Sequence, residues 1–476
     1  MADRPVADDA RPVVIVSNRG PVSFAFDDRG ELVSRRGGGG LVTALGPAVA
    51  GTGALWIAAA LSEADREAAR RGVEEARGYR LRSLVIDPDS YRAYYDVISN
   101  QTLWFLHHHL FDAPRQPRFD EHWRAAWHAY RQVNATFARA VTESAPEGAT
   151  VLVQDYHLSL LAPELAAERP DLRPVHFNHT PFCSPDVLRM LPAAVATELL
   201  EGLAAHVACG FHAERWALAF EACCRQVLGG APPTFVSPGA ADAEGVAEVA
   251  RSPECAAALA DLEGRVGGRR LIVRVDRIEL SKNLLRGFHA FDHLLGSRPE
   301  WRRRVVFGAF VYPSRATLPA YQAYRQEVEG IVARINQTWG TDDWTPILYD
   351  VADDFPSSVA ALRRFDVLLV NPLRDGLNLV AKEGMLVNQR DGVLALSRES
   401  GVWGELGQAA LELNPYDVAE TAEVLHAALA MDAAARRRHA DELRRRAAAR
   451  TPRDWLGDQL RAGATVTASS RGRPAG

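Results

Sequence analysis

Short apolar runs alternate with longer stretches of helical periodicity along most of this chain. Several of the runs consist almost entirely of Val, Leu and Ile, as expected for strands buried on both faces of a parallel sheet. The predicted strands are Val13–Ser17, Val151–Gln154, Val175–Asn178, Leu271–Val275, Val305–Val311, Val367–Asn371 and Val393–Ser397. The predicted helices between them include Arg118–Ser144, Ser281–Leu295, Leu318–Trp339 and Ala419–Met431. Alternating strands and helices predict a doubly wound α/β fold.

The length and one change of composition predict two domains. A chain of 476 residues is too long for a single ordinary domain. Residues 229–265 break the pattern with a Gly- and Pro-rich stretch and an Ala-rich segment, and a new βα series then begins. We therefore expect one α/β domain over residues 12–240 and a second over 241–444. Residues 1–11 and 463–476 are polar or rich in Ser, Gly and Arg, and we expect them to be disordered.

Charge and cysteine content exclude several classes of protein. A net charge of −5 argues against a nucleic-acid-binding surface, which would be basic. No run of about 18 apolar residues is present, and the first residues lack the apolar core of a signal peptide. Five cysteines without a CxxC pair are typical of a protein of the reducing cytosol. The expected location is therefore cytoplasmic, with no membrane or nucleic-acid partner. A symmetric homo-oligomer is compatible with these data.

Only two of the 55 basic residues are lysines, Lys282 and Lys382. The composition therefore favours arginine wherever any cation will serve. A compact ammonium on a flexible stem does a different job from a planar guanidinium. We expect both lysines to occupy positions where arginine is not an equal substitute, although chance survival is the alternative.

Polar residues follow the predicted strands of the first half. Ser17-Asn-Arg19 ends the first strand, and four consecutive glycines, Gly37–Gly40, precede a helix-compatible stretch. Glycines let the backbone approach a ligand closely, and amides at a helix start can hold an anion; a plain hairpin tip is the alternative. Asp155 and His179 follow the next two strands, where they suit hydrogen bonding to hydroxyls or acid–base work.

Two motifs of the second half indicate a diphosphate. Arg277 and Lys282 lie at one strand-to-helix junction, where two cations can neutralise a diphosphate without a metal. The run from Asp375 to Glu383 combines a carboxylate, a Gly turn, a helix start that can hold phosphate, and a second carboxylate placed for a ribose diol. Surface salt bridging and an ordinary strand–turn–helix are the alternatives.

Other catalytic signatures are missing from the sequence. There is no Walker A motif, no GxGxxG, no HExxH and no GxSxG. Asp87-Pro-Asp89 is the only evident Asp-x-Asp run, and it has no further acidic or His ligand nearby, so a turn is the better interpretation. We expect neither a metal nor a cofactor, and the missing GxGxxG disfavours a nicotinamide dehydrogenase.

Taken together and in order over residues 12–455, these motifs resemble the trehalose-6-phosphate synthase family. The resemblance implies a GT-B fold: two facing Rossmann-like domains with the active site in the cleft between them. It implies an N-terminal domain that binds the acceptor, a C-terminal domain that binds the nucleotide sugar, and a last helix, about 445–462, that crosses back to the first domain. It also implies a retaining transfer of glucose from UDP- or GDP-glucose to glucose 6-phosphate, giving α,α-trehalose 6-phosphate.

The resemblance also implies a role for each site residue. Asp155, His179, Arg277, Lys282 and Asp375 would be catalytic, with Arg277 and Lys282 on the diphosphate, Asp375 on the transferred glucose and His179 near the reacting carbon. A backbone amide of Gly39 or Gly40 would also contact the diphosphate, and the backbone of Leu377, Asn378 and Leu379 would contact the glucose and the phosphates. Glu383 would bind the ribose, and the base would stack near Phe355. The acceptor would be bound by Arg19, Tyr95, Trp104, Asp155 and Arg315. Front-face attack, with the leaving phosphate taking the acceptor's proton, would need no covalent nucleophile.

Two departures from the family pattern leave the nucleobase and the acceptor open. Ala59 stands where relatives commonly carry a second tryptophan after Trp56, and the usual Arg-Leu-Asp-Tyr-Ser-Lys-Gly run reads Arg-Ile-Glu-Leu-Ser-Lys-Asn over 277–283. Both departures, with the Arg/Ala bias, resemble an actinobacterial branch in which some members use GDP-glucose. The rival functions are a glucosylglycerol-phosphate synthase, a cyclitol-coupling pseudoglycosyltransferase, and a non-catalytic sugar-phosphate sensor. A sensor is expected to lose catalytic residues, and none is lost.

Overall fold

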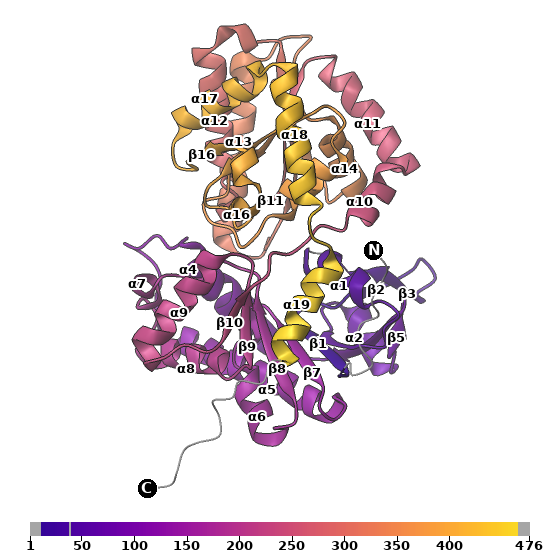
Figure 1. The fold of residues 1–476 in the computed structure, drawn as a ribbon, viewed down its shortest axis with the longest axis vertical. Helices are drawn as coiled ribbons and strands as arrows, with labels where there is room; N and C mark the ends of the chain where they lie inside the picture. The colour runs from indigo at the N-terminus through magenta and orange to yellow at the C-terminus, as the bar shows by residue number, and fades with distance from the viewer. Residues whose placement is uncertain (1–10, 38–39, 465–476) are drawn as a thin grey trace. The chain divides into compact units, whose positions relative to one another are not determined.

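The computed structural model describes residues 11–37 and 40–464, which form two compact units (Figure 1). Unit 1 contains the described residues up to Leu106, together with Phe111–Ser237 and the residues from Arg453 on. Unit 2 contains His107–Leu110 and Pro238–Pro452. Apart from the short segment His107–Leu110, the chain thus enters unit 2 at Pro238 and returns to unit 1 at Arg453.

Unit 1 is built on a sheet of eight strands in the order β10-β9-β8-β7-β1-β4-β6-β5, all parallel except β5. The strands of this unit, with the separate hairpin β2–β3, are β1 (Val13–Ser17), β2 (Val22–Phe26), β3 (Leu32–Arg36), β4 (Leu55–Ala59), β5 (Glu75–Ala76), β6 (Tyr79–Leu84), β7 (Thr150–Gln154), β8 (Arg173–Asn178), β9 (Ala208–Phe211) and β10 (Thr234–Val236). The strands of this sheet that follow β1 are added on one side of it up to β6, and those from β7 on are added on its other side, so Ser17 and Gln154 end adjacent parallel strands at the sheet's switch point.

The helices of unit 1 include a long π-helical segment. The helices are α1 (Gly40–Val49), α2 (Glu63–Arg70), α3 (Pro88–Arg92), the π-helix η1 (Ala93–Leu103), α4 (Trp104–His108), α5 (Glu121–Ser144), the 3₁₀ turn η2 (Tyr156–Leu158), α6 (Leu161–Glu168), α7 (Pro185–Leu188), α8 (Ala193–Ala204), α9 (Glu214–Leu228) and α19 (Pro452–Ala464). The hydroxyl of Thr102 donates to the carbonyl of Val97, five residues back, which accords with the wide π turn. The final helix α19 packs on the central strands: Trp455 lies edge-on to Phe177, and Gln459 accepts a hydrogen bond from Gln154.

Unit 2 is a second doubly wound unit with a fully parallel sheet of six strands in the order β13-β12-β11-β14-β15-β16. Its strands are β11 (Arg270–Ile278), β12 (Val305–Pro313), β13 (Ile347–Val351), β14 (Val367–Val370), β15 (Val393–Ser397) and β16 (Leu411–Leu413). Its helices are α10 (Ala243–Ala250), α11 (Pro253–Val266), η3 (Leu280–Lys282), α12 (Leu284–Ser297), η4 (Pro299–Trp301), α13 (Pro319–Trp339), α14 (Phe355–Arg364), α15 (Leu379–Val387), α16 (Trp403–Leu406), η5 (Gly407–Ala409), α17 (Val418–Ala430) and α18 (Ala433–Ala447). Figure 1 shows α12, α13 and α17 on one side of β11, and α10, α11 and α14 on the other.

The predicted α/β class is confirmed, and every strand predicted from the sequence is present. Two predicted helices begin three residues later than expected, α5 at Glu121 and α12 at Leu284. Asn283 adopts a left-handed backbone conformation, φ 60°, so Leu280–Lys282 forms a separate 3₁₀ turn and α12 starts only at Leu284. This turn holds Lys282 next to the carboxyl end of β11.

Candidate functional site

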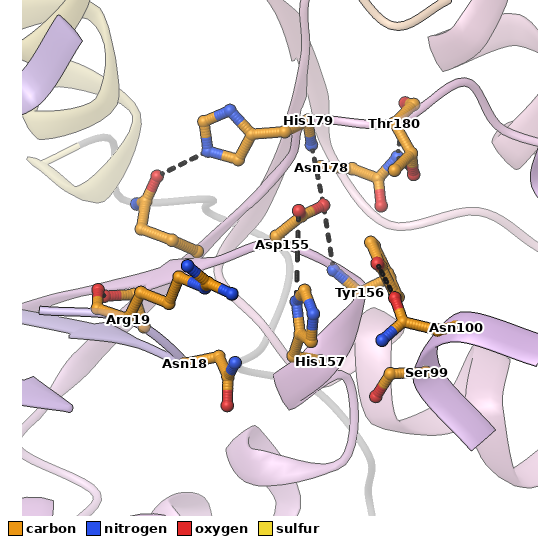
Figure 2. Close-up of polar contacts among 12 residues, drawn as sticks. Asn18, Arg19, Ser99, Asn100, Asp155, Tyr156, His157, Asn178, His179 and Thr180 are labelled. Atoms are coloured by element: carbon orange, nitrogen blue, oxygen red, sulfur yellow. Dashed lines mark hydrogen bonds and ion pairs between the residues drawn. The ribbon is translucent and has the colours of Figure 1, made fainter. Parts of the chain in front are cut away.

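Asp155 joins the ends of two neighbouring strands in unit 1 (Figure 2). Its carboxylate accepts hydrogen bonds from the backbone N–H of Tyr156, at 3.0 Å, and of His179, at 3.2 Å. Asp155 itself has φ 72°, a left-handed conformation that is uncommon for a residue with a side chain. Such backbone strain is typical of functional sites.

The imidazole of His179 is held on both sides. Its Nε2 lies 3.0 Å from Oε1 of Gln154, and its Nδ1 lies 3.2 Å from Nε2 of His212. The ring also packs against Trp455, with 5.5 Å between the ring centroids. Burial lowers the pKa of His179 to about 3, so the ring is neutral at pH 7. Of the two uses expected from the sequence, this environment favours hydrogen bonding over acid–base work.

Arg19 and Tyr95, both assigned to the acceptor, lie close together. The Arg19 guanidinium is 3.5 Å from the Tyr95 hydroxyl, and the Tyr95 ring stacks on His157 with 5.8 Å between centroids. In Figure 2 the Arg19 side chain extends toward Asp155 and His157. Trp104 lies one ring further away, with its centroid 6.0 Å from that of Tyr156. The structure thus groups these acceptor residues of unit 1 around one set of aromatic rings.

A cavity of about 130 Å³ lies beside Arg19. Small side chains make up much of its wall, and Ala59 is among them. The full lining is Arg19, Gly20, Val22, Ser23, Gly37, Trp56, Ala58, Ala59, Leu61, Asp65, Leu81 and Ser83. Ala59, one of the two departures from the family pattern, therefore lines a cavity beside Arg19, a residue expected to bind the acceptor.

In unit 2, Lys282 and Asp375 form an ion pair. The ammonium Nζ lies 2.6 Å from Oδ2 of Asp375, and both side chains are mostly buried. Burial opposes the charge of Lys282, but the carboxylates of Asp375 and Asp276 outweigh it and raise the pKa of the ammonium above its usual value. The positive charge of Arg277 has the opposite effect and lowers the pKa of Lys282. Beyond the ends of β11 and β14, an ammonium and a carboxylate are therefore in contact, and the charge of Arg277 is close enough to affect the ammonium.

The loop from Asp375 to Asn378, here called the donor loop because it was predicted to bind the donor, is followed by a capped helix, α15. The Asn378 side chain accepts a hydrogen bond from the N–H of Ala381 at 3.1 Å, and Asn378 has φ 94°. The helix therefore starts at Leu379, and Leu377 and Asn378 belong to the preceding loop. One amide of the first helical turn is thus already bonded within the protein.

Glu383 is a buried carboxyl group on α15. Its side chain is only 7% exposed. Burial, reinforced by the nearby carboxylate of Asp242, raises the pKa of Glu383 to about 7. A carboxyl group in such surroundings is a candidate for binding a polar ligand.

Arg315 is held inside unit 2 rather than displayed on its surface. Its side chain is 7% exposed and forms an ion pair with the fully buried carboxylate of Glu279. The hydroxyl of Tyr321 also donates to Glu279, at 2.5 Å. An acceptor phosphate at Arg315 would have to share the guanidinium with Glu279.

Three further residues were predicted to contact the donor: Gly39, Gly40 and Phe355. Gly39 lies outside the described residues, whereas Gly40 is the first residue of α1. Phe355 is the first residue of α14 and is 41% exposed, so its ring is accessible to a base.

Residues 11–37 and 40–464 contain no group of three His, Cys, Asp or Glu side chains arranged to bind a metal. Within the same ranges no helix is long and apolar enough to cross a membrane.

Sequence reasoning missed several residues of these clusters. His212 directly follows β9, a four-residue strand that was not predicted, so a third strand-end side chain escaped notice. Arg274 was read as part of a strand, yet its guanidinium donates to Asp276 at 2.8 Å and to the carbonyl of Lys282 at 2.9 Å. A charged residue inside an otherwise apolar strand was the signal that could have revealed it.

Comparison with known proteins gives consistent matches over nearly the whole chain. Residues 11–462 match the model of glycosyltransferase family 20. The chain is 33% identical to a bifunctional trehalose-6-phosphate synthase/phosphatase of Thermoproteus tenax over 88% of its own length, but spans only 59% of that protein. It is 32% identical to a UDP-forming α,α-trehalose-phosphate synthase of Aspergillus niger, covering 88% of this chain and 90% of the relative. The crystal structure of a Burkholderia xenovorans UDP-forming synthase in complex with glucose-6-phosphate superposes with a TM-score of 0.82 at 29% identity, covering 95% of this chain and all of that one.

Proposed function

The chain belongs to glycosyltransferase family 20, and we propose that it is a retaining glucosyltransferase that makes α,α-trehalose 6-phosphate from a nucleoside-diphosphate glucose and glucose 6-phosphate. The Aspergillus niger and Burkholderia xenovorans relatives are UDP-forming, which supports UDP-glucose as the donor. One observation carries the proposal: Lys282 pairs with Asp375 beyond the carboxyl ends of the adjacent strands β11 and β14, and Arg277 lies at the end of β11.

In the proposed reaction the bond between the glucose C1 and the diphosphate oxygen breaks, and the new bond forms from the acceptor's C1 hydroxyl on the same face. Negative charge develops on the departing diphosphate. The leaving oxygen of that diphosphate takes the proton of the acceptor hydroxyl. The ammonium of Lys282 and the guanidinium of Arg277 are preorganised cations that stabilise this charge. Asp375 orients Lys282 and binds the transferred glucose, and Glu383 accepts hydrogen bonds from the ribose.

On the acceptor side, Arg19 and Tyr95 bind the 6-phosphate and Asp155 binds sugar hydroxyls. Arg315 is a second phosphate ligand, provided that the phosphate shares it with Glu279. The neutral ring of His179 contacts the donor sugar as a hydrogen-bonding group. The location that fits these substrates and the five buried cysteines is the reducing cytosol.

The cavity beside Arg19 supports a second candidate, a transferase of the same fold with another acceptor. Ala59 and its small neighbours leave room that a different phosphorylated acceptor could occupy, such as glycerol phosphate or a cyclitol. The Arg/Ala bias and Ala59 also support an actinobacterial-type branch, for which GDP-glucose is the competing donor.

A donor-by-acceptor assay tests the proposal. UDP- and GDP-glucose are each offered with glucose 6-phosphate, glycerol 3-phosphate or buffer, and the nucleoside diphosphate released is measured. Release that depends on glucose 6-phosphate is the expected result. The sugar nucleotide that supports this release identifies the nucleobase of the donor. Release that depends on glycerol 3-phosphate would move the assignment to the second candidate. Silence with every pair would contradict both the trehalose-phosphate and the glycerol-phosphate reactions and would favour cyclitol coupling or a non-catalytic sensor.

We predict that donor binding depends on pH through Glu383. The pKa of its carboxyl group is about 7, so this group is protonated below pH 7 and charged above it, and only the charged form accepts from both ribose hydroxyls. Affinity for the nucleoside diphosphate should therefore fall up to about tenfold per pH unit below 7 and level off above it. Calorimetric titrations between pH 5.5 and 8.5 measure this. The ligand's phosphate titrates in the same range, so Glu383→Gln is the control: its profile should lack this component, and identical profiles would remove Glu383 from the ribose site.

A further inference from the structure

The second lysine, Lys382, is buried in unit 2 and its ammonium is shared between two segments. The side chain projects from α15 and is 1% exposed. Its Nζ donates to the carbonyl of Gly239 at 2.6 Å and lies 2.8 Å and 2.7 Å from the two carboxylate oxygens of Glu405. A buried ammonium is tolerated only with such partners, because loss of Glu405 would leave its charge uncompensated and loss of the carbonyl would leave a buried N–H donor unsatisfied.

The first partner belongs to the segment through which the chain enters unit 2. Gly239 lies three residues before Asp242, whose side chain caps α10 by accepting from the N–H of Gly245 at 3.0 Å. The Asp242 carboxylate in turn lies near enough to Glu383 to act on its ionisation. The bond from Lys382 to Gly239 therefore fixes the surroundings of its own sequence neighbour, the proposed ribose ligand.

The second partner belongs to the structure behind the donor loop. Glu405 lies on α16, and the residues just before that helix hold Leu377: the N–H of Val402 and the hydroxyl of Ser400 each donate to its carbonyl at 2.9 Å. A Cβ built on Gly401 would lie 1.8 Å from the carbonyl oxygen of Gly376, so the two loops are in direct backbone contact. Movement of α16 would consequently move the loop from Asp375 to Asn378.

We propose that Lys382 is a positioning residue for the donor site, which holds the Gly239 segment and α16 against α15 so that Glu383 and the 375–378 loop keep their binding geometry. The inference deepens the proposed function, since it takes the donor to bind at those residues. Lysine suits the position because one compact ammonium reaches all three acceptor atoms, which the larger planar guanidinium of arginine does not replicate. This accounts for its retention in a chain whose other cations, Lys282 apart, are all arginine.

The test compares Lys382→Met with a matched control, Arg364→Met. Arg364 is equally enclosed, 3% exposed, and pairs with the buried Asp366 at 2.9 Å. That pair lies immediately before β14, at the end of the strand opposite to the donor loop. Both variants remove one partner of a buried ion pair from the same unit, so both should lose thermal stability. Only Lys382→Met should affect the donor.

Dissociation constants are measured by calorimetry on the full chain for UDP, GDP and glucose 6-phosphate. We expect Lys382→Met to weaken the better nucleoside diphosphate at least tenfold and to leave glucose 6-phosphate within twofold, with Arg364→Met within twofold for both. Unchanged nucleotide binding in Lys382→Met, or equal loss of both ligands, would overturn the proposal. If Lys382→Met does not fold, Glu405→Gln, which keeps the shape of the partner, is held to the same expectations.

This measurement separates the positioning role from the proposed reaction. Nucleotide binding needs no turnover, so a wild-type protein that binds UDP or GDP but releases none from a sugar nucleotide would count against the synthase function alone. Wild-type protein that binds neither nucleotide would overturn the role of Lys382, because there would be no donor site for it to position.

Discussion

Lys282→Ala should reduce turnover by about 10² to 10³ while the protein remains folded. A preorganised hydrogen-bond donor aimed at charge that develops in the transition state typically contributes a factor of this size. Lys282 fits that description because its ammonium is fixed 2.6 Å from Asp375 and stays charged, with its pKa raised by the neighbouring carboxylates. The loss should appear in kcat more than in the KM for the donor, because charge builds on the diphosphate only as the bond breaks.

Lys282→Arg is the informative companion variant. It keeps the positive charge but replaces a point charge by a larger planar group in a mostly buried space beside Arg277. We expect it to be impaired as well, although less than Lys282→Ala.

Single-turnover rates with saturating donor and acceptor measure the effect, and circular dichroism with a thermal melt checks the fold. Lys282→Ala leaves Asp375 without its partner, so a lowered Tm is expected and does not count against the role. A folded Lys282→Ala protein with near-normal turnover would rule out leaving-group stabilisation by this residue.

The long strands were predictable from the sequence because each is buried on both faces. β1 and β15 are apolar runs of Val, Leu, Ile and Ala that end in a single serine, and such runs have a single good environment in a soluble α/β protein. The short strands were not predictable in the same way. β9 reads Ala-Cys-Gly-Phe and gains its place from pairing with β8 and β10, which is a contact between distant segments and not a property of four residues.

The candidate site shows the same difference between features that are local in the sequence and contacts between distant segments. Asp155, His179, Lys282 and Asp375 were predicted as site residues because each follows a strand, where a parallel sheet binds ligands. Side-chain contacts that link distant segments were not predicted, because they depend on packing. The pairing of Arg315 with Glu279 joins positions 36 residues apart, and the bond from Lys382 to Gly239 joins positions 143 apart. Periodicity and spacing carry no information on such pairs, and both change what the arginine and the lysine can do.

Arg19→Met should raise the KM for glucose 6-phosphate by about 10- to 100-fold. A hydrogen bond to a charged group contributes about 1.5 to 3 kcal/mol, which corresponds to this range. Arg19 lies within reach of Tyr95 and extends toward Asp155 and His157, so its guanidinium is placed among the proposed acceptor residues (Figure 2). Removing it takes away a phosphate contact but no group that acts on the donor.

Glucose, which has no phosphate, serves as the internal comparison for Arg19→Met. If Arg19 binds the 6-phosphate, wild type and variant should use glucose equally poorly, and the difference between them should appear only with glucose 6-phosphate. Arg29→Met is the charge-matched control, because it removes an exposed arginine of the β2–β3 hairpin in the same unit and should leave both acceptors unaffected. Equal losses with glucose and glucose 6-phosphate would instead assign Arg19 to the sugar ring or to the shape of the neighbouring cavity, because a phosphate ligand acts only on an acceptor that carries one.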